Sequence, residues 1–131
     1  MDFYYLHLLS RLILGVYFIL NGLNHFKNLN FLREWVKNKN IPAPTFMVII
    51  SGFLLLIGGF SILLGVYIYF GILALTLFFI PTTFLMHDFW NEKEEQSKNL
   101  QMINFMKNLA LWAALISLIF IPQPWPFSLG N

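Results

Sequence analysis

Long apolar segments separated by short polar ones dominate this chain. Four of them, residues 4–26, 46–67, 69–90 and 105–121, approach the ~20 residues that a helix needs to cross ~30 Å of hydrocarbon. In lipid the backbone polar groups must bond within the chain, and the alternating pattern of barrel strands is absent, so the segments are predicted to be helices. The predicted fold is all-α, a single domain over residues 1–131 that forms an integral membrane bundle of four transmembrane helices.

The composition also points to lipid as the solvent. Of the 131 residues, 58% are hydrophobic and 11% are charged, whereas soluble domains carry roughly 25% charged residues. Asp2 stands where a cleaved secretory signal would carry a basic residue, so the first helix is expected to be retained. The chain has no cysteine, which excludes disulfides and a thiol relay within it, and nothing in its charge pattern suggests nucleic acid as a partner.

The basic residues predict an orientation. Seven of the eight Lys and Arg residues lie in or beside the first and third connections, at Lys27, Arg33, Lys37, Lys39, Lys93, Lys98 and Lys107. The positive-inside rule places these connections in the cytoplasm and both termini on the outer side of a bacterial cytoplasmic (inner) membrane. Residues 29–39 repeat apolar positions at helical spacing and are predicted to form an interfacial helix. The proline-rich tail is expected to lie extended on the outer surface, with Trp125 in the outer aromatic belt.

One face of the first helix collects its glycines and its ionisable residues. The spacing of four, four, three, four and three residues joins His7, Arg11, Gly15, Phe18, Gly22 and His25. Such a stripe is expected to face the bundle. In the second helix the pairs Gly52/Gly59 and Gly58/Gly65 are each seven residues apart, which predicts close neighbours on two sides.

Arg11 admits two explanations. A charge near the bilayer centre costs ~2.5–3.5 kcal/mol, so the side chain could snorkel outward and bind helix-end carbonyls, a lipid phosphate or a carboxylate. Alternatively, it could hold an anionic or carbonyl-bearing ligand, such as a quinone headgroup, in an outer cleft. The candidate residues of this outer site are Arg11, Gly15, Gly58, Gly59 and Thr76.

A second group of polar residues lies at the inner end of the predicted helices. Its candidate members are Asn21, His25, His87, Asp88, Lys107 and Asn108. Histidine with a carboxylate could bind a metal or relay protons. Because no helix carries ligand-type spacing, no metal site is predicted, and we favour a structural network in which Asp88 pairs with Lys107 or Lys27.

Several short motifs resemble the DoxX family of small four-span membrane proteins. They are Arg11 with Gly15 and Gly22, Ile41-Pro42, Gly58-Gly59 followed by Gly65, His87-Asp88-Phe89-Trp90, and Phe105-Met106-Lys107-Asn108-Leu109. The resemblance implies a four-span fold and, for some members, association with membrane redox complexes such as a thiosulfate:quinone oxidoreductase. The chain departs from the family pattern at Leu55 and Leu56, near which many relatives have a glutamate, and at Ala113-Ala114, where many have Gly-Gly.

These features together favour a non-catalytic subunit or scaffold of a membrane redox or stress-response system. The expected partners are the lipid bilayer and redox-complex subunits, and four short spans also suit a homo-oligomer. No resident cofactor is predicted, because no flavin or nucleotide motif is present, and the chain is not expected to be an enzyme on its own. The alternatives are a quinone- or lipid-binding oxidoreductase component and a small proton-coupled transporter.

Overall fold

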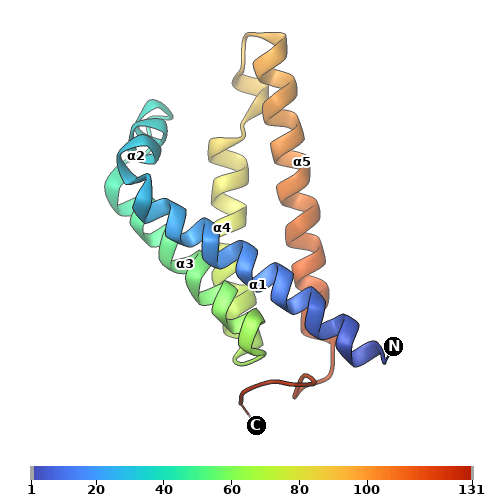
Figure 1. Ribbon diagram of the computed structural model, residues 1–131. Helices are drawn as coiled ribbons and strands as arrows, with labels where there is room; N and C mark the ends of the chain where they lie inside the picture. The colour runs from blue at the N-terminus through green and yellow to red at the C-terminus, as the bar shows by residue number, and fades with distance from the viewer. Residues whose placement is uncertain (1, 131) are drawn as a thin grey trace.

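The computed structural model describes residues 2–130, which form helices and connecting loops without a strand (Figure 1). The elements are α1 (Phe3–Lys27), α2 (Leu29–Asn38), α3 (Pro44–Leu64), α4 (Ile68–Met86), η1 (Phe89–Asn91), α5 (Glu95–Ser117) and η2 (Leu118–Phe120). Helices α1, α3, α4 and α5 belong to the four segments that are long and apolar enough to cross a membrane. The predicted all-α membrane bundle is therefore confirmed.

The two ends of the bundle differ in what they carry. Both chain ends lie at one end of the molecule, and α2 lies at the other with the connection between α4 and α5 (Figure 1). The interfacial helix predicted over residues 29–39 is present as α2. The basic connections therefore share one end of the molecule, as an even number of spans requires.

The start of α5 and the end of α4 differ from their predicted positions in ways that affect the site. Helix α5 begins at Glu95, ten residues before the predicted start at residue 105, and it takes up part of the expected loop. Polar residues can extend a helix beyond the hydrocarbon, and an acidic residue in its first turn complements the helix dipole. Helix α4 ends at Met86, so that His87 and Asp88 lie in the turn before η1 rather than in the helix predicted to reach residue 90.

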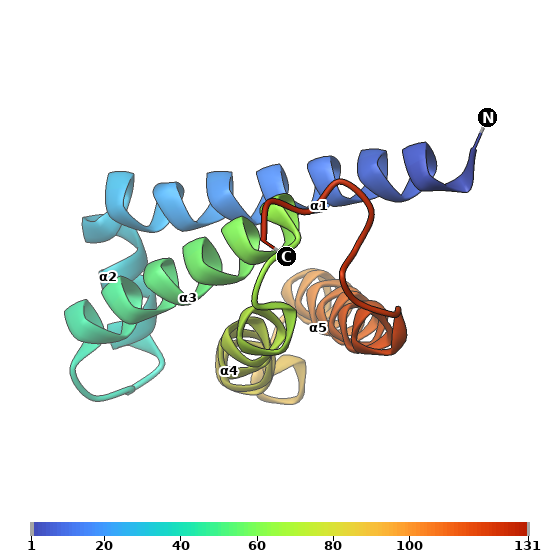
Figure 2. The ribbon, with the colours of Figure 1, turned by 90° about the horizontal axis from the view of Figure 1, so that it is seen from below.

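Helix α3 lies between α1 and α4, as its two glycine faces predict (Figure 2). A Cβ atom on Gly59 would lie 2.9 Å from the backbone nitrogen of Ile19 in α1. A Cβ atom on Gly58 would lie 2.2 Å from Cγ of Leu75 in α4. The backbones can approach this closely only because both positions lack a side chain.

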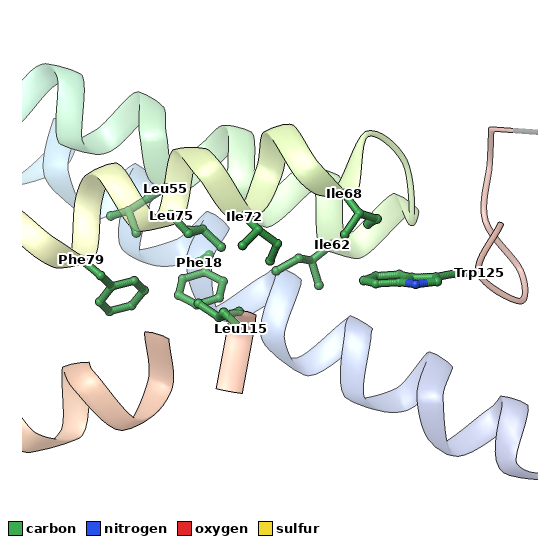
Figure 3. Packing of buried hydrophobic residues seen from close by; sticks show 9 residues of the cluster. All are labelled: Phe18, Leu55, Ile62, Ile68, Ile72, Leu75, Phe79, Leu115 and Trp125. Carbon is green, nitrogen blue, oxygen red and sulfur yellow. The ribbon is translucent and has the colours of Figure 1, made fainter. Parts of the chain in front are cut away.

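The buried core follows the contact between these helices. Figure 3 shows it as a row with Phe79 at one end and Trp125 at the other; its members are Phe18, Leu55, Ile62, Ile68, Ile72, Leu75, Phe79, Leu115 and Trp125. Helix α5 contributes Leu115 as its buried residue and contacts α4. Most large apolar side chains outside this row are exposed, which suits a surface in contact with lipid.

Candidate functional site

The stripe on α1 faces the bundle as predicted. Helix α1 buries Arg11, Gly15, Phe18 and Gly22, and His7 and His25 are partly buried at the two ends of the same face. Because the helical repeat places residues three and four apart on one side, the sequence spacing alone determines this face.

Arg11 is 2% exposed and donates three hydrogen bonds to backbone carbonyls. Nε donates to the carbonyl of Ile62 at 3.2 Å, and Nη2 donates to that of Leu63 at 3.0 Å. Both carbonyls belong to the last turn of α3, where they lack helical donors and form the negative end of the helix dipole. Nη1 donates to the carbonyl of Pro126 in the tail. The helix-end role predicted for Arg11 is thus present, and a ligand role for it stays a prediction.

Gly65 makes room for the guanidinium group. It ends α3 in the left-handed region at φ 73°, where a side chain would be strained. A Cβ atom at this position would also lie 2.7 Å from Nη2 of Arg11. Gly65 therefore has two roles: it allows the left-handed turn that ends α3, and it leaves space for the Arg11 side chain.

The C-terminal tail is mostly exposed, as predicted, but it turns back onto the bundle and buries Trp125, which was expected in an aromatic belt at the membrane surface. Trp125 is 2% exposed, and Cζ of Arg11 lies 5.7 Å from the centroid of its ring. The edge of the His7 ring meets the same indole at 5.0 Å between centroids. The amide of Leu129 donates to the carbonyl of Leu64 at 3.0 Å, which fixes the tail to the end of α3 (Figure 2). The guanidinium group and the imidazole ring thus pack against the buried indole, whose Nε1 has no hydrogen-bond partner among the described residues.

The other residues of the outer candidate site lie in helix contacts. A Cβ atom on Gly15 would meet Leu63 of α3, and Gly58 and Gly59 face α4 and α1. Thr76 accepts a hydrogen bond from Nε1 of Trp112 in α5 at 3.0 Å and donates to the carbonyl of Ile72. The structure thus brings Arg11, Gly15 and Gly59 to the α1–α3 contact but places Gly58 and Thr76 at contacts with α4 and α5.

At the end of the bundle that carries α2, the predicted partner of Asp88 is wrong. Asp88 forms an ion pair with Lys39, whose Nζ also lies 3.6 Å from Oε1 of Glu92. Lys107, one of the two predicted partners, instead donates to Asn104 of its own helix at 3.3 Å. Lys39 follows α2, and the chain folds so that this end of α2 lies beside η1.

The two inner histidines bond separately. Nδ1 of His25 lies 2.8 Å from the carbonyl oxygen of Asn21, one turn earlier in α1. Nδ1 of His87 lies 2.8 Å from Oε1 of Gln101 in α5. Asn108 is half-buried on α5. Among residues 2–130 no group of three or more His, Asp and Glu side chains is placed to hold a metal ion.

The model of the DoxX family matches residues 6–88, which include the α1 stripe, the α3 glycines and the His87-Asp88 turn. The chain belongs to the DoxX family. No curated protein and no solved structure matched it.

This DoxX protein also contains a feature that the sequence analysis missed. A partly open cavity of about 120 Å³ lies beneath α2, between α3 and α4, with His25 and His87 in its wall. Its other walls are mostly apolar and include Trp35, Met47 and Phe78. The apolar repeat of residues 29–36 was a signal for it, but the sequence could not show that α2 folds over the neighbouring helices rather than resting on lipid.

Proposed function

We propose that this DoxX protein is a non-catalytic membrane subunit that supports a redox or stress-response system in a bacterial cytoplasmic membrane. The proposal rests on the hydrogen bonds of Arg11: Nε, Nη1 and Nη2 each donate to a backbone carbonyl of the same chain. The one ionic group within the first span is therefore explained by structure without a substrate. The link to redox or stress response rests on the family resemblance.

Helix α5 offers the surface that such a subunit would present to a partner. It contacts α4 and the short helices η1 and η2, whereas Met106, within the apolar part of the helix, is exposed. An apolar helix packed on one side only can accept a second transmembrane helix at little cost, because lipid is exchanged for protein of similar polarity.

A photo-reactive amino acid at Met106 tests this proposal. We expect it to cross-link in native membranes to a second membrane protein, which mass spectrometry of the purified adduct would identify. The matched control is Ile13 on α1, which is about as exposed as Met106 (62% against 60%) and is expected to react with lipid. Adducts containing a second copy of the chain would support a homo-oligomer instead. Turnover of a reductant with a quinone by the purified chain alone would contradict the proposal.

The proposed orientation has its own test. The chain has no cysteine, so single cysteines can be introduced at the exposed positions Asn38, Gln96 and Gln123. In intact cells we expect an impermeant thiol reagent to label the cysteine at Gln123 and to leave the other two unlabelled until the membrane is opened. The reverse labelling pattern would invert the topology.

A further inference from the structure

The cavity beneath α2 has the size of one aromatic ring. Its volume is about 120 Å³, and an engineered protein cavity of roughly 150 Å³ with apolar walls binds benzene. The mouth of the cavity allows substituents on the ring to extend outward. The space does not suit a nucleotide or another large polar ligand.

The walls favour an aromatic occupant. The ring of His25 meets that of Phe78 edge-on, with centroids 5.9 Å apart and planes at 78°. Trp35 and His87 form a second such pair at 5.9 Å and 65°. Methionines 47 and 86 complete the lining with polarisable sulfur. Edge-to-face and sulfur–aromatic contacts would each stabilise a bound aromatic ring, in addition to the free energy gained by burying its apolar surface.

The hydrogen bond of His25 indicates which polar group the bound aromatic ring should carry. The carbonyl of Asn21 can only accept, so Nδ1 of His25 carries the proton and donates to it. In neutral His25 the remaining nitrogen, Nε2, is then an acceptor that makes no hydrogen bond with another described residue, and the His25 side chain lines the cavity. The Ser51 hydroxyl in the same wall donates to the carbonyl of Met47 at 2.7 Å. The cavity thus offers an unused acceptor and calls for a donor on the ligand.

We propose that this cavity binds one aromatic ring bearing a hydroxyl group, a lipid-soluble phenol, whose hydroxyl donates to Nε2 of His25. The site is separate from the Arg11 site and does not depend on the supporting role proposed above. The phenol ring could be a small free molecule or the head of a larger tailed lipid, and both would present the same hydroxyl to His25.

Fluorine NMR on the full chain in lipid nanodiscs tests the proposal with 4-fluorophenol and fluorobenzene as probes. After subtraction of empty nanodiscs, we expect 4-fluorophenol to bind about fivefold more tightly, as one hydrogen bond would give. Displacement by 4-nonylphenol at lower concentration than by phenol would assign the site to tailed phenols, and equal displacement would assign it to small ones.

Substitutions at four positions distinguish binding in this cavity from unspecific partitioning of the probes into lipid. His25→Phe keeps the ring but removes the acceptor, so the preference for the phenol should vanish while fluorobenzene still binds. Ser51→Leu, or Thr82→Leu from the α4 wall, fills the cavity and should abolish saturable binding of both probes. His7→Phe, at the other end of α1, is the matched control and should change neither. Equal affinity for both probes in the wild type, or phenol binding that survives the filled cavity, would overturn the proposal; thermal unfolding of each variant establishes that it is folded.

Discussion

Replacing Arg11 with leucine is expected to lower the free energy of unfolding by about 3 kcal/mol, even though the change removes a charge from the bilayer. The loss arises because the carbonyls of Ile62 and Leu63 at the end of α3, and that of Pro126 in the tail, lose their donor together. Arg11 and Ile62 are both buried, so at least the carbonyl of Ile62 would be left without a donor. Thermal unfolding in a fixed detergent measures the loss, and the amount of protein in the membrane fraction should not fall.

Two further substitutions make the Arg11 result specific. Arg11→Lys keeps the charge but cannot reach three carbonyls with a forked group, so its stability should lie between those of Arg11→Leu and the wild type. Arg33→Leu is the matched control, since Arg33 lies at the surface and pairs with Glu34 at 3.4 Å in solvent. We expect no measurable change for it. If Arg11→Leu unfolds at the wild-type temperature, the helix-end role assigned to Arg11 is not structural.

The sequence predicted well those features that one helix determines by itself. The stripe from His7 to His25 follows from the helical repeat, because a buried arginine and two glycines on one face exclude lipid as their neighbour. The two glycine faces of α3 likewise predicted a helix with neighbours on both sides. These predictions depend only on the spacing of residues within one helix, so they do not require knowledge of how the other segments fold.

Features that depend on how distant segments meet could not be read from the sequence. Lys39 and Asp88 are 49 residues apart, and nothing in either segment distinguishes Lys39 from the other basic residues nearby. The burial of Trp125 depends on the tail folding back onto Arg11 and His7. The cavity beneath α2 likewise arises only when three helices and the end of α1 are assembled.

The structure shows what Leu55 and Leu56 contact at the place where the chain departs from the family resemblance. Leu55 and Leu56 stand near the position where many relatives have a glutamate. Leu55 is in the core at 2% exposure, and Leu56 packs so closely on α1 that a Cβ atom on Gly22 would lie 2.9 Å from its Cγ. Both leucines are thus used in helix packing, and the charge of Arg11 is stabilised by the carbonyls at the end of α3.

The two members of the ion pair Lys39–Asp88 are expected to contribute unequally to the free energy of unfolding. Lys39 faces both Asp88 and Glu92, and the side chains of the pair are 18% and 15% exposed. Lys39→Met leaves two carboxylates without their cation and should cost about 2–3 kcal/mol in unfolding free energy. Asp88→Asn leaves Lys39 with Glu92 and should cost only about 1 kcal/mol.

The double variant distinguishes this pairing from the one that the sequence suggested. Lys39→Met combined with Asp88→Asn should unfold at a higher temperature than Lys39→Met alone, because one of the two stranded carboxylates is gone. Lys107→Met should change little alone and should not restore Asp88→Asn, since Lys107 bonds Asn104 on its own helix. Lys37→Met, on the exposed side of α2, controls for the loss of a basic residue there. Rescue of Asp88→Asn by Lys107→Met, with no coupling to Lys39, would return Asp88 to the partner predicted from the sequence and would leave the end of α2 without its anchor to the α4–α5 connection.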